Sequence, residues 1–118
     1  MTPNSMNINQ IKGRIVTDPE VKETTTGKKF LTFNLMYYTR QTTDKDGSHA
    51  NFIHVEVWEK LAEVFHSILK KGLEVVINGA LVQSRWVDKN QNKKSRFHIS
   101  AETLAVSDLN FEGQKEAA

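Results

Sequence analysis

Apolar and polar residues alternate along most of this chain, which is the pattern of half-buried β-strands. In the clearest run, residues 30–38, the side chains of Leu31, Phe33 and Leu35 fall on one face, followed by Tyr37. Similar runs recur between polar segments that contain turn residues. The pattern predicts strands over residues 8–16, 21–25, 30–38, 52–58, 73–87 and 95–106.

Side-chain parity divides the later strands into an inward and an outward side. The outward positions of residues 52–58 hold Phe52, His54, Glu56 and Trp58. His98, in the last strand, is interpreted as a strand-surface residue. The residues expected to face inward in the last three strands are Ile53, Val55, Val57, Val75, Ile77, Gly79, Leu81, Phe97, Ile99 and Ala101.

One segment has helical rather than strand periodicity. Its apolar residues recur three and four positions apart and form a single stripe, made by Leu61, Val64, Phe65, Ile68 and Leu69. Glutamates near its start and lysines near its end suit the helix dipole, and Gly72 is a natural residue to follow the last turn. Residues 39–51 are expected to form a long exposed loop, and residues 88–94 a polar turn.

The resulting order is strand, strand, strand, helix, strand, strand, with the short run at residues 21–25 leading into the second strand. A closed, twisted sheet of five strands with a helix in that place is the OB-fold pattern. We therefore expect an all-β protein, a five-stranded OB-fold Greek-key barrel with one α-helix between the third and fourth strands. Residues 1–6 are expected to be a disordered extension, 7–106 the folded domain and 107–118 a flexible tail.

Length and composition narrow the class of protein. A chain of 118 residues fits one domain, and the absence of cysteine excludes disulfides and thiolate metal sites. No apolar run approaches the roughly 18 residues that a membrane span needs. The N-terminal segment also lacks the apolar core of a secretory signal. These observations predict a soluble, cytoplasmic protein without a membrane contact.

The distribution of charge is more informative than the formal net charge of +2. Five basic residues stand close together against one acidic residue, Asp88. Such a basic stretch is an electrostatic footprint for phosphates, although a solvated hairpin would carry the same charges. The basic residues are Arg85, Lys89, Lys93, Lys94 and Arg96.

Trp58 and Trp86 are the most informative single residues, because each stands at the parity opposite the inward aliphatic side chains. A large aromatic side chain that points out of a barrel needs something to cover it. A stacked nucleobase is one such cover and a subunit interface is the other. The parity leaves both open.

The motifs occur in the order of a known family. The chain contains GRIVTDPEVKETTTGKKFLTFNL, then WEKLAEVFHSILKKG, then VVINGALVQSRW and DKNQNKKSRFHISAETL. These resemble, in turn, the opening, the helix, the following strand and the basic hairpin of bacterial single-stranded DNA-binding proteins. The resemblance runs in register from about residue 7 to residue 106.

The resemblance implies sequence-independent binding and protection of single-stranded DNA in replication, recombination and repair, near the nucleoid. It also implies a homotetramer, with a dimer as the alternative. DNA would wrap over aromatic and basic side chains. The contact positions that it implies are Trp58, Trp86, Phe52, His54, Tyr38, Lys60, Lys71, Arg85, Lys89, Lys93, Lys94 and Arg96.

The sequence departs from the family in three places. Its positions Val82 and Ser84 are often basic in relatives, and the loop over residues 39–51 is shorter and lacks a tryptophan. The chain ends NFEGQKEAA, without the acidic tip that recruits replication and repair enzymes in the family. We therefore expect no recruitment of partners through such a tip.

Two other classes of protein compete with this interpretation. A primosome-type OB-fold protein acting mainly through protein partners would also lack the acidic tip, and would be dimeric. An OB-fold nuclease is disfavoured, because the sequence contains no clustered carboxylates and no P-loop, GxSxG or HExxH motif. The four histidines lack metal spacing, so we expect neither an enzyme nor a cofactor.

Overall fold

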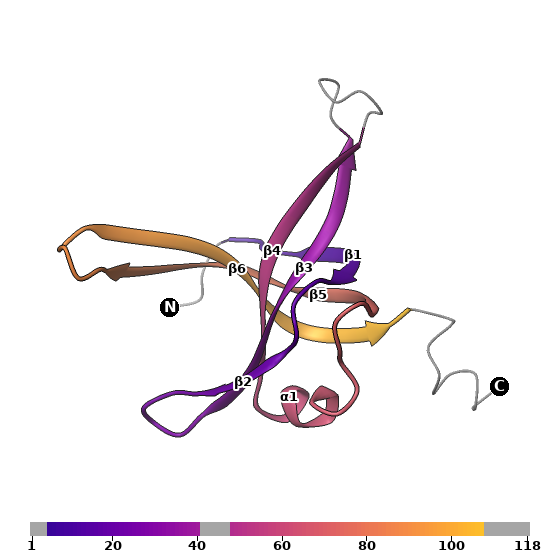
Figure 1. Cartoon of the computed structure of the whole chain (residues 1–118), viewed down its shortest axis with the longest axis horizontal. Coiled ribbons are helices and arrows are strands. Elements are labelled where there is room, and N and C mark those ends of the chain that lie inside the picture. Colours follow the sequence, from indigo (N-terminus) through magenta and orange to yellow (C-terminus); the bar gives the residue numbers. More distant parts are fainter. Residues whose placement is uncertain (1–4, 41–47, 108–118) are drawn as a thin grey trace.

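The computed structural model describes residues 5–40 and 48–107 of the chain. These residues form six strands and one short helix (Figure 1). None of the helical structure in the two described ranges is long and apolar enough to cross a membrane. The elements are β1 (Asn9–Ile15), β2 (Glu20–Glu23), β3 (Lys29–Arg40), β4 (Ser48–Trp58), α1 (Glu59–Phe65), β5 (Glu74–Val87) and β6 (Lys93–Val106).

Five of the strands close into a barrel. The hydrogen-bonded order runs β1, β5, β6, β4, β3, and the ring closes where Ile15 of β1 pairs with Leu35 of β3. The β4–β6 pairing is parallel and the other four are antiparallel. Strand β2 lies outside the ring, where it pairs with the first half of β3. The predicted OB-fold, with a helix between the third and fourth strands of the barrel, is confirmed.

The barrel interior is filled by the residues that parity placed inward. Leu35, Val55, Val57 and Val75 have no measurable exposure, and Phe33 is 2% exposed. Residues of α1 and of the turn after it, Ala62 and Leu69, cover one end of this core. Alternation in the sequence thus becomes alternation between core and surface, which is how each strand fixes its register.

Gly79 marks a place where two strands approach too closely for a side chain. The β5–β6 register shifts between Asn78 and Gly79, and a Cβ atom at Gly79 would overlap the carbonyl oxygen of Ser100. A glycine is therefore required by the contact itself. The predicted inward position of residue 79 is correct, and the missing side chain lets the backbones of β5 and β6 approach each other.

The β3–β4 and β5–β6 hairpins extend beyond the barrel as arms (Figure 1). The β3–β4 arm continues to Arg40 and resumes at Ser48, so the prediction of a loop over residues 39–51 is wrong at both ends. Polar residues can extend a hairpin because the ladder satisfies their backbone groups while both faces meet water. The Asp44–Gly47 turn lies outside the described residues. The β5–β6 arm likewise leaves a shorter turn than predicted, since β6 begins at Lys93.

Parity fails as a guide to burial on the β5–β6 arm. Leu81 and Phe97 were expected to face inward, but they are 39% and 52% exposed. Both stand at inward parity. Leu81 pairs with the buried Ile99 and so lies at the rim of the barrel, whereas Phe97 lies farther out on the arm, opposite Gln83. The expectation of burial is therefore wrong, and an apolar strip remains on the back of the arm.

The helix is shorter than its periodicity predicted. It ends at Phe65, and Val64 of the predicted stripe is 60% exposed. The chain then turns towards β5, with Leu69 buried. Gly72, at a φ of +94°, donates its backbone N–H to the Ile15 carbonyl oxygen at 2.7 Å rather than closing a helix. Tertiary packing of this turn replaces the last helical turns.

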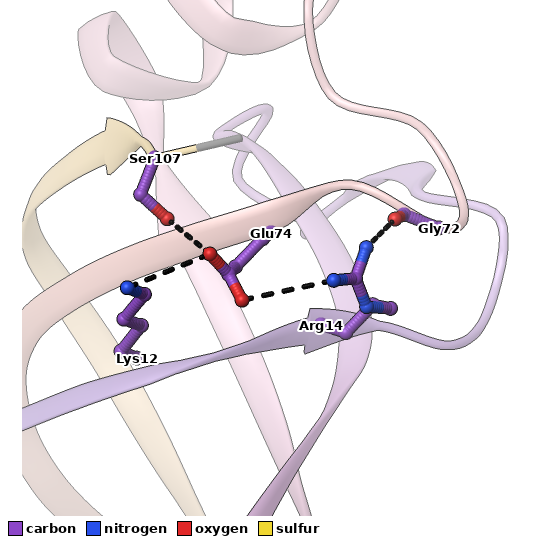
Figure 2. A network of polar contacts seen from close by, with 5 residues as sticks. All are labelled: Lys12, Arg14, Gly72, Glu74 and Ser107. Carbon is purple, nitrogen blue, oxygen red and sulfur yellow. Dashed lines mark hydrogen bonds and ion pairs between the residues drawn. The ribbon is translucent and has the colours of Figure 1, made fainter. Parts of the chain in front are cut away.

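A polar network joins the start of β5 to β1 and to the end of β6 (Figure 2). The Glu74 carboxylate lies 3.6 Å from the Lys12 ammonium and 3.7 Å from the Arg14 guanidinium, and accepts a hydrogen bond from the Ser107 hydroxyl at 3.2 Å. Arg14 also donates to the Gly72 carbonyl oxygen at 2.6 Å. The Lys12 and Arg14 side chains are exposed and that of Glu74 is 29% exposed, so each pair contributes at most about 1 kcal/mol to folding.

Candidate nucleic-acid interface

The strand register brings one set of side chains to the side of the sheet opposite the core. Met36 pairs with Phe52, and His54 pairs with both Asn34 and His98. The other residues of this side of the sheet follow from the same pairing register across β3, β4, β6 and β5. We call this set the outer sheet face; it comprises Phe30, Thr32, Asn34, Met36, Tyr38, Phe52, His54, Glu56, Trp58, Ala80, Val82, Ser84, Trp86, Lys94, Arg96, His98 and Ser100.

Three large aromatic side chains of this face are exposed. Tyr38 and Phe52 are each 64% exposed on the β3–β4 arm, and Trp86 is 46% exposed on the β5–β6 arm. Because β4 pairs with β6, the two arms leave the barrel from neighbouring strands. Together the arms offer flat apolar surfaces at separate places along one face, which suits ligands that carry a series of planar groups.

Trp58 has different surroundings from the other aromatic residues. Its ring stacks on Phe30, with centroids 4.2 Å apart and planes inclined by 18°. The indole N–H donates to Glu56 Oε1 at 3.3 Å. The side chain is half-buried, so a neighbour in the same chain covers part of the ring. The sequence interpretation had weighed only a base or another subunit as the cover, and missed Phe30 although it stands at outward parity.

The predicted basic residues divide between the two faces of the β5–β6 arm. Lys94 and Arg96 pair with Trp86 and Ser84 on the outer sheet face. Arg85 and Lys93 have the opposite parity and lie on the back of the arm. The turn at the tip of the arm carries Lys89. An extended ligand that carries a row of phosphates would therefore meet basic side chains along the outer sheet face and around the tip of the β5–β6 arm.

Lys60 and Lys71 stand apart from these residues. Lys60 lies on α1 and lines a groove between the helix and the β2–β3 hairpin. Lys71 lies in the turn after α1. The structure therefore does not bring these two lysines together with the outer sheet face through any strand pairing.

The centre of the outer sheet face is polar. His98 Nε2 lies 3.2 Å from Glu56 Oε1, and His98 Nδ1 lies 3.3 Å from the Ser84 hydroxyl. His98 is only 5% exposed, so its interpretation as a strand-surface residue is wrong. The parallel β4–β6 pairing encloses His98 between neighbouring strands, and no feature of the local sequence predicts that pairing.

His54 lies beside this centre. Its Nδ1 lies 3.1 Å from Asn34 Oδ1. Burial lowers the pKa of His54 below the usual 6.5, and the Arg96 guanidinium lowers it further, against an opposing effect of Glu56. The imidazole is therefore neutral at pH 7. Within residues 5–40 and 48–107, no three His, Asp or Glu side chains gather to hold a metal ion.

Comparison with known proteins places the chain in a family. The sequence profile described as "Single-strand binding protein family" matches residues 6–107. The single-stranded DNA-binding protein of Corynebacterium glutamicum is 31% identical over 101 residues, which cover 82% of this chain and 45% of that protein. The single-stranded DNA-binding protein 1 of Synechocystis sp. is 32% identical over 111 residues, which cover 94% and 87% of the two chains.

The chain spans about half the length of several of its curated relatives, among them that of Corynebacterium glutamicum and that of Treponema pallidum, of which 53% is covered. A solved structure titled "Plasmodium falciparum SSB complex with ssDNA" shares the fold, with a TM-score of 0.79 and 24% identity over 92% of this chain and all of that chain. The fold and the profile agree over the same residues. The chain belongs to the single-strand binding protein family.

Proposed function

We propose that this chain binds single-stranded DNA independently of sequence, and that it protects unpaired strands in replication, recombination and repair at the nucleoid in the cytoplasm. The observation that carries the proposal is the outer sheet face with its exposed rings of Tyr38, Phe52 and Trp86. Rings that share one sheet face can each stack on one planar group of the same extended ligand. The names of the relatives support the same conclusion.

Base stacking explains why the bound strand must be single. Every base has a planar face, so exposed rings accept any sequence, but in a duplex those faces are already stacked on each other. We assign the stacking positions to Tyr38, Phe52, Trp86 and the outward ring face of Trp58. His54 stands among them as a neutral polar contact.

Phosphate neutralisation explains affinity without sequence readout. We assign the nearest phosphate contacts to Lys94 and Arg96, which share the outer sheet face with the rings. A single DNA strand that passes around the β5–β6 arm would meet the basic side chains at the tip and on the back of the arm. The further contacts proposed on this basis are Arg85, Lys89 and Lys93, with Lys60 and Lys71 at the periphery.

A gel shift with unlabelled competitors tests the proposal. Labelled single strands are bound first, and competitors of unrelated single-stranded sequence should displace them equally well. A duplex of equal length should compete much more weakly. Equal competition by the duplex would contradict a stacking mode, and a single preferred sequence would contradict sequence independence.

We also propose that the protein is a homo-oligomer, most simply a tetramer. Two exposed features support this. Leu81 and Phe97 form an apolar strip on the back of the β5–β6 arm. In addition, over residues 9–13 the edge of β1 that faces away from β5 pairs with no strand of the described chain, so it could pair across a two-fold axis.

Light scattering at micromolar concentration tests the assembly. A tetramer is the expected mass, whereas a monomer would contradict the proposal. A dimer that binds single strands weakly would instead favour the alternative of a primosome-type OB-fold protein that acts through protein partners. In either case the proposed action is binding rather than catalysis.

A further inference from the structure

The outer sheet face carries one carboxylate at its centre, that of Glu56. A carboxylate on a surface that binds phosphates opposes binding through like-charge repulsion. Its side chain is 17% exposed and that of His98 is 7% exposed, so water screens this charge only in part. A negative charge in this place therefore requires a compensating task.

The contacts of Glu56 indicate that task. One oxygen atom, Oε1, accepts the hydrogen bond from the Trp58 indole N–H and also lies 3.2 Å from His98 Nε2. His98 is itself held at its other ring nitrogen by Ser84, across the β5–β6 pairing. A chain of polar contacts thus runs from β5 through β6 to the indole on β4.

Phe30 completes the environment of the indole. Stacked at 4.2 Å, it occupies one face of the Trp58 ring and leaves the other face as the one on which a base can stack. The hydrogen bond to Glu56 fixes the rotation of the ring about its side-chain bonds, which the stack alone would not fix.

We propose that Glu56 is a positioning residue, which, held by His98, fixes the Trp58 ring against Phe30 so that the ring is ready to receive a base. This inference rests on the proposed binding of single-stranded DNA. A ring that is already ordered loses less conformational entropy when a base stacks on it. The gain in affinity from that order outweighs the repulsion between the carboxylate and the phosphates.

Three variants separate positioning from charge. Glu56→Ala removes the charge and the acceptor, whereas Glu56→Gln removes the charge and keeps an acceptor oxygen for the indole N–H. Glu20→Ala is the matched control, since Glu20 pairs with Thr32 in the same row of the sheet as Glu56 but lies on β2, which β3 separates from the strand of Trp58. Affinity for oligo-dT is measured for each variant at one salt concentration.

Positioning predicts that Glu56→Ala weakens binding by about 2- to 13-fold, the factor for ordering one side chain at about 0.5–1.5 kcal/mol. Glu56→Gln should bind at least as tightly as the wild type, and Glu20→Ala should not weaken binding. A purely electrostatic task predicts the opposite for Glu56→Ala, which would then bind more tightly, in step with Glu56→Gln and Glu20→Ala. That result would overturn the proposal.

A spectroscopic readout follows the ring without DNA. The chain has two tryptophans, so Trp86→Phe leaves Trp58 as the single tryptophan, which is excited selectively at wavelengths that tyrosine does not absorb. In that background Glu56→Ala should lower the fluorescence anisotropy of Trp58, and Glu56→Gln should restore it. Unchanged anisotropy in Glu56→Ala would overturn the proposal even if affinity falls. If the wild type fails to bind oligo-dT, the proposed function fails, whereas this anisotropy measurement still reports on the positioning.

Discussion

Alanine at each tryptophan should separate base stacking from fold stability, because the two rings have different surroundings. Trp86 is 46% exposed on the β5–β6 arm, opposite Lys94. Trp58 is half-buried, stacked on Phe30 and hydrogen-bonded to Glu56. Strand parity predicts that the fold survives the loss of either ring, because both side chains point away from the core, and the contacts of Trp58 make its loss the more costly of the two.

The expected magnitudes follow from those contacts. Trp86→Ala should weaken binding to single strands by about 1–3 kcal/mol, or about 5- to 160-fold, with stability changed by no more than about 0.5 kcal/mol. Trp58→Ala also loses an aromatic pair at about 0.5–1.5 kcal/mol and a hydrogen bond at about 0.5–1.5 kcal/mol. Its free energy of unfolding should fall by about 1–3 kcal/mol, which lowers Tm by about 4–24 °C.

The assay measures melting temperature, mass and affinity for labelled oligo-dT on the same preparations. Phe97→Ala is the matched control, because Phe97 is 52% exposed on the same arm but at the opposite parity. Its affinity should match the wild type as long as its mass does. The stacking assignment would be refuted if Trp86→Ala kept its mass, its Tm and its affinity. It would also be refuted if Phe97→Ala kept its mass but lost as much affinity as Trp86→Ala.

Three further changes test other parts of the account. Lys93→Ala should reduce the slope of log affinity against log salt by about 0.7, the value for one phosphate contact on a single strand, in titrations at several salt concentrations. Folding lowers the pKa of His54. The stability that this residue contributes is therefore fully present above pH 6.5 and is lost as the pH falls towards the folded-state pKa. Thermal melts of His54→Gln should show a smaller loss of stability over that pH range than melts of the wild type. A bound phosphate near His54 would favour the charged imidazole that forms as the pH falls, so affinity should rise from pH 7.5 to pH 5.5, and less so in His54→Gln. Gly79→Ala should lower Tm sharply in thermal melts, because its Cβ would overlap the Ser100 carbonyl oxygen, and an unchanged Tm would contradict the close approach of β5 and β6.

Much of the barrel could be predicted from periodicity, since alternation records which side of a strand meets the core. Leu31, Phe33 and Leu35 are buried as expected. Alternation does not record where a strand leaves the barrel, because side chains keep their parity along an arm that has no core beside it. Phe97 and Leu81 were therefore misassigned, and the polar arm of β3 and β4 resembled a loop.

The face on which several candidate residues lie could be predicted, but their arrangement could not. Outward parity selected Phe52, Trp58 and Trp86 correctly for the outer sheet face. The stack of Trp58 on Phe30 depends on the β3–β4 register across 28 positions of sequence, and the burial of His98 depends on the parallel β4–β6 pairing. Pairings of this kind join distant segments, and a local pattern does not encode them.

The most direct test of the account is a titration of intrinsic tryptophan fluorescence with oligo-dT and, at the same salt concentration, with a duplex of equal length. Stacking of bases on Trp58 and Trp86 predicts strong quenching and tight binding by oligo-dT, and much weaker binding by the duplex. Equal affinity for the two nucleic acids, or tight binding of oligo-dT without quenching, would contradict the central claim that exposed rings of the outer sheet face receive the bases of a single strand.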